Sequence, residues 1–178
     1  MHEQILEFWF DELKPAMWWK KDKSLDRLIQ QRFSEVHRQA AQGELWPWRH
    51  TPSGRLAEII LLDQFSRNIY RDHPESFACD GMALVLAQEA IAAGADQALP
   101  VAQRSFLYMP FMHSESLAIH EQAVALFSTP GMESNLDFEL RHRDILRRFG
   151  RYPHRNKVLG RVSTEEELRF LTQPGSSF

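Results

Sequence analysis

Apolar residues recur along the chain at helical rather than alternating spacing. Nine prolines and several glycines interrupt this pattern, so it predicts a series of helices and no convincing strand. The predicted helices cover approximately residues 5–13, 24–43, 54–65, 77–94, 100–108, 114–128, 138–149 and 163–171. We therefore expect an all-α protein of seven or eight helices.

The helix predicted over 54–65 is apolar around its whole circumference, which is typical of a helix buried at the centre of a fold. Thr51 followed by Pro52 predicts its start, because a threonine cap and a proline in the first turn favour helix initiation. Ser24 is the predicted N-cap of the second helix. Ser163 and Glu166 fit the spacing of a capping box at the start of the last helix.

Length and composition indicate one globular domain. The chain has 178 residues, of which 43% are apolar and 25% charged, so it is too apolar for intrinsic disorder and too polar for a membrane protein. We expect a single domain over residues 1–172 and a flexible tail over 173–178. The first residues show no leader signature, and Cys79, the single cysteine, forbids an internal disulfide. These features predict a cytoplasmic protein of bacterial type.

Several polar residues lie where the helical period predicts apolar ones, and burying a charge is costly unless it is paired or functional. Asp63 shares a face of the central helix with Leu56 and Ile59, and Arg67 lies four residues further on. The spacing predicts an ion pair between Asp63 and Arg67, which could either close the end of the helix or belong to a site. Asp80 lies on an apolar face near the start of the next helix, where an acid also suits the helix dipole.

Three histidines also lie at positions where the helical period predicts apolar residues. The stripe His113, Leu117, His120, Val124 and Phe127 places two histidines on one apolar face. The stripe Phe138, His142, Ile145 and Phe149 places a third on the next helix. A single buried histidine is commonly a hydrogen-bonded core residue, but three of them together with Asp63 favour a polar cavity between helices.

An arginine-rich loop follows the predicted helix over 138–149. The window from Arg141 to Arg161 carries a charge of +7, and the remainder of the chain carries −10. Arginine forks bind carboxylate or phosphate, so the loop could present several guanidinium groups to one anion. The alternative is a connection whose arginines pair with acids elsewhere in the chain. Residues 64–72, which follow the central helix, form a comparable polar cluster.

These segments also carry a resemblance to a known family. The segments concerned are Leu62–Arg71, Phe77–Asp80, Met109–Glu115, Arg148–Asn156, Leu159–Arg161 and Ser163–Glu166. Together they resemble the uncharacterised bacterial family called domain of unknown function 924, from near Ile5 to Leu171. The resemblance implies a right-handed superhelix of antiparallel helix pairs, similar to tetratricopeptide-repeat proteins but without their consensus. It implies no known activity and transfers no catalytic residue.

The first functional hypothesis is a site for a small anionic ligand, such as a phosphorylated one, with or without an enzymatic reaction. His113 or His154 would act as general acid or base, and Glu115 or Asp63 would orient it. The expected ligand-binding residues are Arg67, Asn68, Arg71, Asp80, Arg151, Arg155, Asn156 and Arg161. The second hypothesis is an interaction module whose arginine-lined concave groove holds an acidic peptide.

Other functions have less support in the sequence. Glu139 and His142 form half of a di-iron motif, but no second copy appears, so we expect no metal and no cofactor. Cys79 precedes Asp80, whose charge would raise the thiol pKa, so we expect a plain thiol rather than a nucleophile. The absence of strands excludes a glycine-rich nucleotide fold. The overall acidity argues against a nucleic-acid partner, and no segment is long and apolar enough to span a membrane.

Overall fold

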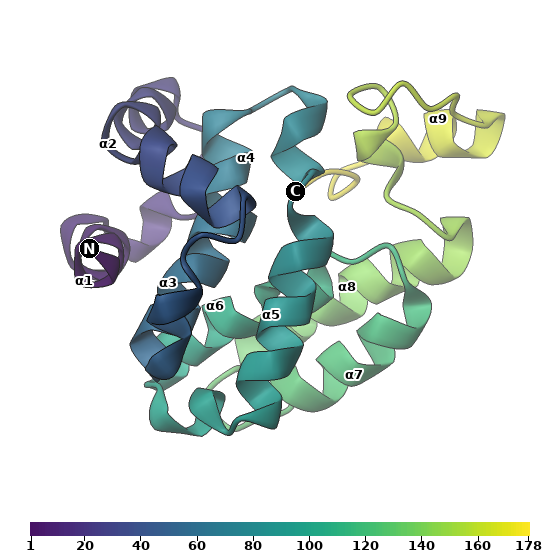
Figure 1. The fold of residues 1–178 in the computed structure, drawn as a ribbon. Coiled ribbons are helices and arrows are strands. Elements are labelled where there is room, and N and C mark those ends of the chain that lie inside the picture. Colours follow the sequence, from purple (N-terminus) through teal and green to yellow (C-terminus); the bar gives the residue numbers. More distant parts are fainter. The chain divides into compact units, whose positions relative to one another are not determined.

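A computed structural model describes residues 1–178 and confirms the all-α class. Its α-helices are α1 (His2–Glu7), α2 (Lys23–Ala41), α3 (Pro52–Ile60), α4 (Ser66–Ile69), α5 (Asp80–Ala92), α6 (Val101–Met112), α7 (Leu117–Phe127), α8 (Glu133–Phe149) and α9 (Glu165–Leu171) (Figure 1). Short 3₁₀ and π-helical turns connect many of them. None of the helices is long and apolar enough to cross a membrane.

The chain forms two compact units. The first comprises Met1–Arg71 and Glu75–Pro110, and the second comprises Asp72–Pro74 and Phe111–Phe178. The single domain over 1–172 and the flexible tail over 173–178 stay predictions.

The first unit is built around α3, as its apolar circumference predicts. Every residue from Leu56 to Leu62 is fully buried, and α3 packs against α1 and α5. The helix does not stop at Phe65. A π-helical turn, η4 (Leu61–Phe65), continues it directly into α4, so one helical run extends to Ile69. This run places Asp63 and Arg67 on successive turns.

The observed caps differ from the predicted ones by one or two residues. Asp22, not Ser24, caps α2, and its Oδ1 accepts the backbone N–H groups of Ser24 (2.8 Å) and Leu25 (3.3 Å). The capping box of α9 pairs Thr164 with Glu167, not Ser163 with Glu166. In both cases a neighbouring residue of suitable chemistry reaches the free N–H groups better. Thr51 caps α3 as predicted.

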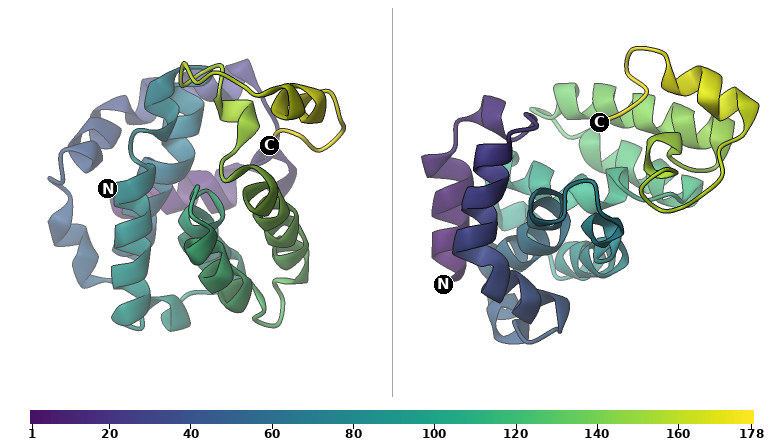
Figure 2. Two further views of the ribbon diagram at one scale, coloured as in Figure 1. Left: turned by 90° about the vertical axis from the view of Figure 1, so that its right-hand side faces the viewer. Right: turned by 90° about the horizontal axis from the view of Figure 1, so that it is seen from above.

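The second unit contains α7 and α8, which pack side by side as a helical hairpin (Figure 2). Gly150 ends α8 in the left-handed conformation, with φ of 70°, which glycine adopts without strain. The chain then forms an irregular segment with one 3₁₀ turn, η7 (Pro153–Arg155), before α9 begins. Ile145, Leu146 and Tyr152 form a buried apolar cluster here, with Phe149 and Phe170 packed against it. The superhelical arrangement stays a prediction.

Two helical glycines give a matched test of the first unit. A β-carbon at the buried Gly54 would overlap the backbone carbonyl of Trp48, whereas one at Gly81 would meet nothing within 4 Å. We expect Gly54→Ala to lower the free energy of unfolding by about 3 kcal/mol or more. Gly81→Ala should raise it by about 0.5–1 kcal/mol, because alanine restricts the unfolded chain. Urea unfolding measures both, and similar effects of the two substitutions would contradict the packing around α3.

Candidate functional site

The end of the central helix carries the predicted ion pair. Arg67 Nη1 lies 3.3 Å from Asp63 Oδ1, and Asp63 is buried. The same guanidinium binds Asp80 through both carboxylate oxygens, at 2.8 and 3.0 Å. Arg67 therefore joins η4 to the first turn of α5, so the three polar residues that the sequence singled out in this region lie together.

Asn68 and Arg71 converge on an acid that the sequence analysis did not single out. Arg71 donates from Nε and Nη2 to both carboxylate oxygens of Asp26, and Asn68 Nδ2 donates to Oδ1 at 2.9 Å. Asp26 lies in the first turn of α2, where an acid has an ordinary structural reason to occur. No local signal distinguishes it from a solvated helix-start residue.

A buried hydrogen-bond chain lies next to these pairs. His37 donates from Nε2 to Ser66 Oγ (2.7 Å), because the Ser66 hydroxyl itself donates to the carbonyl of Leu62 (2.6 Å). Burial lowers the pKa of His37 and therefore favours its neutral form. Burial also raises the pKa of Cys79. A hydrogen bond with Ser66 lowers this pKa, and the negative charge of Asp80 raises it further, so the net shift is upward. The predicted effect of Asp80 on this thiol has the correct sign.

In the second unit, Glu167 fixes the beginning of the arginine-rich loop. Arg151 donates from Nε and Nη2 to the two oxygens of Glu167, at 2.7 and 2.8 Å. The same carboxylate accepts the backbone N–H of Thr164 (2.8 Å) and Nδ2 of Asn156 (3.3 Å). These hydrogen bonds lower the pKa of Glu167 to about 2, and the bond from Arg151 has the largest effect. One buried carboxylate thus caps α9 and anchors the loop.

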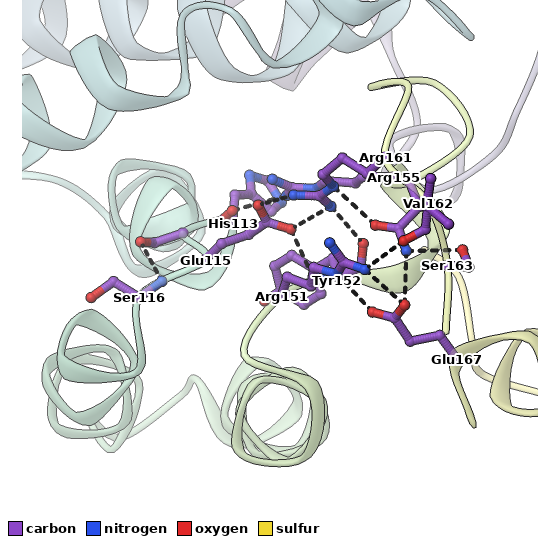
Figure 3. A network of polar contacts seen from close by, with 12 residues as sticks. His113, Glu115, Ser116, Arg151, Tyr152, Arg155, Arg161, Val162, Ser163 and Glu167 are labelled. Atoms are coloured by element: carbon purple, nitrogen blue, oxygen red, sulfur yellow. Dashed lines mark hydrogen bonds and ion pairs between the residues drawn. The ribbon is translucent and has the colours of Figure 1, made fainter. Parts of the chain in front are cut away.

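Glu115 fixes the other side of the loop (Figure 3). Arg161 forks its carboxylate at 2.7 and 2.9 Å, and the backbone N–H of Tyr152 donates to Oε1 at 2.7 Å. Burial alone would raise the pKa of Glu115, but the hydrogen bonds from Arg161 and Tyr152 and the charge of Arg155 outweigh it and lower the pKa. Arg161 also donates from Nε to Asn156 Oδ1 (2.9 Å), which connects the two carboxylate centres.

Arg155 is more buried than Arg151 and Arg161 of the same loop. Its side chain is 6% exposed, its Nη2 donates to the backbone carbonyl of His113 (2.9 Å), and its guanidinium lies 4.7 Å above the Tyr152 ring centre. His113 lies in the turn between α6 and α7, and His154 directly precedes Arg155 in η7. The half-buried imidazoles of His113 and His154 therefore belong to the segments that surround this guanidinium.

His120 and Glu139 form a fully buried pair between α7 and α8. His120 Nδ1 lies 2.6 Å from Glu139 Oε1, and His120 Nε2 donates to the carbonyl of Ser114 (2.8 Å). Because Nε2 is a donor, the Nδ1–Oε1 contact holds a single proton. Burial raises the pKa of Glu139, which favours placing this proton on the carboxyl group rather than on His120 Nδ1. Glu139 Oε2 is buried without a hydrogen-bond partner.

His142 has an aromatic environment. Its Nδ1 donates to the carbonyl of Phe138 (2.7 Å), and its ring stacks on Phe178 with 3.7 Å between the centroids. Tyr152 contacts it edge-on at 5.7 Å. Burial, aided by the charges of nearby histidines, lowers the pKa of His142 to about 3.

Two of the predicted histidine positions are confirmed, and the stripes around them are partly wrong. His120 and His142 are buried, whereas His113 precedes α7 and is half-buried. Leu117 and Phe138, predicted to be buried, are 42% and 49% exposed. In α8 the buried position next to Phe138 is Glu139, because α8 turns this side chain toward α7, where it meets His120.

The predicted site residues fall into separate groups. The second unit brings together His113, Glu115, Arg151, His154, Arg155, Asn156 and Arg161, and the first unit holds Asp63, Arg67, Asn68, Arg71 and Asp80. Arg67, Arg71, Arg151 and Arg161 each bind a carboxylate of the chain, as the alternative interpretation of the arginines describes. Sequence reasoning missed Asp26, His37 and Glu167, and it weighed Glu139 only as a metal ligand.

Comparisons with known proteins are consistent with this architecture. The family described as "Bacterial protein of unknown function (DUF924)" matches residues 5–175. A solved structure of a protein of unknown function, ATU0120 from Agrobacterium tumefaciens, is 39% identical, with a TM-score of 0.91 over 96% of each chain. No curated protein matches the sequence. These similarities establish the family and the fold and carry no activity.

Neighbouring glutamates test the anchoring role of Glu167. We expect Glu167→Gln to lower the free energy of unfolding by about 2–3 kcal/mol, because it leaves the half-buried Arg151 beside a neutral amide and weakens the cap of α9. Glu166 makes an exposed pair with Arg148, so Glu166→Gln should cost less than about 0.5 kcal/mol. Urea unfolding at neutral pH measures the difference, and equal effects would refute the role of Glu167.

The pKa of His142 predicts a pH dependence of stability. Its folded value of about 3 lies below the ordinary value of 6.5, so between these values the unfolded chain binds a proton that the folded chain does not. This contribution is complete above pH 6.5 and is lost as the pH falls, by about 1.4 kcal/mol per pH unit. Urea unfolding between pH 6 and 4 gives the slope of the free energy of unfolding against pH. We expect this slope to be smaller in His142→Phe, by the amount that uptake of about one proton on unfolding contributes. His50→Gln, at an exposed histidine, should keep the wild-type slope, and an unchanged slope in His142→Phe would contradict the prediction.

Proposed function

The chain belongs to this family of bacterial proteins of unknown function, and we propose from its own geometry that the second unit binds a small anionic molecule. Arg155 is the positive anchor of the proposed site, and His113 and His154 are the groups able to exchange a proton with the ligand.

The convergence of the loop around Arg155 is the observation that carries the proposal. The carbonyl of His113 and the ring face of Tyr152 are among the groups that hold this guanidinium in place. Its charge also acts on Glu115, whose carboxylate is already forked by Arg161. Positive charge is therefore fixed in place next to two half-buried imidazoles, which is the kind of preorganisation that anion binding requires.

The other predicted residues of this unit have positioning roles in the proposal. Glu115 and Arg161 hold the backbone of Tyr152, whose ring supports Arg155. Arg151 and Asn156 tie the loop to Glu167. Loss of any of these contacts would displace the anchor without removing it. In the first unit, ligand-binding roles for Asp63, Arg67, Asn68, Arg71 and Asp80 stay predictions.

Three expectations from the sequence accompany the proposal. A tetratricopeptide-like stacking of helix pairs, an interaction module for an acidic peptide and a cytoplasmic location all remain proposals. The arginines of α8 do not favour the peptide over the small molecule, because Arg141, Arg143 and Arg147 contact acids of the same unit.

A thermal-shift experiment on the full chain tests the anion site. The probes are inorganic phosphate, sulfate, citrate and a panel of phosphorylated metabolites. At 100 times its dissociation constant, a ligand of the folded state should raise the melting temperature by about 5–10 °C. We expect Arg155→Met to abolish this shift, and Arg147→Met, at an exposed pair of α8, to retain it.

Arg155→Lys keeps the positive charge and guards against a folding defect in Arg155→Met. It should bind the same probe more weakly than the wild type, because lysine cannot reproduce the fork geometry. A shift that survives Arg155→Met would overturn the proposal, as would a panel in which no anion stabilises the wild type. Stabilisation by an acidic peptide alone would favour the interaction module instead.

A further inference from the structure

We infer that His142, Tyr152 and His154 form a subsite for a planar ring, which Phe178 of the same chain fills in this structure. The inference deepens the proposed function and rests on it for the ligand class, an aromatic or heteroaromatic ring that carries an anionic group. Phe178 then acts as an internal competitor of that ring.

The three side chains contact Phe178 from different directions. Its ring lies nearly parallel to His142, at 3.7 Å and 25°. Tyr152 and His154 contact it edge-to-face, at 6.2 Å and 77° and at 5.5 Å and 80°. One stacked and two T-shaped contacts are the arrangements that aromatic groups prefer, and together they specify a flat occupant.

The cradle is held by contacts that do not involve Phe178. Tyr152 is buried, its hydroxyl donates to the carbonyl of Met112 (2.6 Å), and its backbone N–H donates to Glu115. The bond from Nδ1 of His142 to the carbonyl of Phe138 orients the imidazole. A site fixed in this way loses little conformational freedom when a ring enters.

Tyr152 connects the cradle to the anion anchor. Its ring contacts His142 and Phe178, and the guanidinium of Arg155 lies over the same ring. His154, which contacts both Phe178 and Tyr152, directly precedes Arg155 in the chain. A ligand with its ring in the cradle can therefore direct an anionic substituent toward Arg155.

Phe178 is suited to be displaced. Its side chain is 45% exposed, although the ring stacks on a buried imidazole. It lies beyond the end of α9, and the intervening segment is held by local hydrogen bonds of Ser176 to Leu171 and Gln173. The ring can leave without unwinding a helix. A competitor in the same chain raises the apparent dissociation constant of the ligand, which equals the intrinsic constant divided by the fraction of time that the site is free.

Two phosphate esters distinguish the contribution of the ring to binding from that of the anionic group. Isothermal titration of the full chain with phenyl phosphate and with methyl phosphate compares ligands that share the charged group and differ in the ring. We expect Phe178→Ala to bind phenyl phosphate about tenfold more tightly than the wild type and methyl phosphate within about twofold of it. Leu168→Ala removes another exposed apolar side chain of this unit and should leave both affinities unchanged.

The outcomes distinguish the subsite from the anion site. If methyl phosphate binds but the phenyl group adds nothing in Phe178→Ala, the subsite is refuted and the anion proposal stands. A neutral ring, phenol, tests the cradle alone, and in Phe178→Ala it should shift the imidazole resonances of His142 and His154. Such shifts without binding of either phosphate would support the subsite and refute the anion site. Absence of any shift with phenol would overturn the inference.

Discussion

The loop between α8 and α9 depends on two carboxylates that neutralise its arginines. Arg151 and Arg161 are only partly exposed, and leaving a partly buried charge without a counter-charge costs several kcal/mol. Glu167 and Glu115 approach from opposite sides and fork one arginine each. The same two carboxylates also accept backbone N–H groups, so the charge pairing fixes the path of the chain. The placement of Tyr152 in the core follows from this path.

The first unit uses the same arrangement at the end of its central helix. Arg67 reaches Asp80 on α5, and Arg71 reaches Asp26 on α2, in each case through both carboxylate oxygens. Arginines that follow an apolar helix here join segments distant in sequence. A positive window in a sequence is therefore weak support for an anion site, because the acids that balance it can lie anywhere in the chain. The proposed site depends instead on how the His113 carbonyl and the Tyr152 ring fix Arg155 beside two histidines.

The sequence predicted whatever depends on local pattern. The all-α class, the buried central helix, the Asp63–Arg67 pair and the burial of His120 and His142 follow from spacing along one helix. The partners did not follow, because Asp26 meets Arg71 across 45 residues, and no period connects them. Glu139 was missed as the partner of His120 for a related reason. A one-residue rotation of the predicted face of α8 exchanges Phe138 for Glu139, and only packing against α7 decides between them.

Tyr152 separates two environments within the second unit. Arg155 lies over its ring, and Arg161 and Glu115 form a forked ion pair next to its backbone. His142 lies against the same ring in surroundings that keep its imidazole neutral, and its other neighbour is an aromatic ring. A fully charged ligand would gain nothing from the second environment, and a fully apolar one would gain nothing from the first. Because one side chain borders both, a molecule that joins a flat part to a charged part matches this unit better than either part alone.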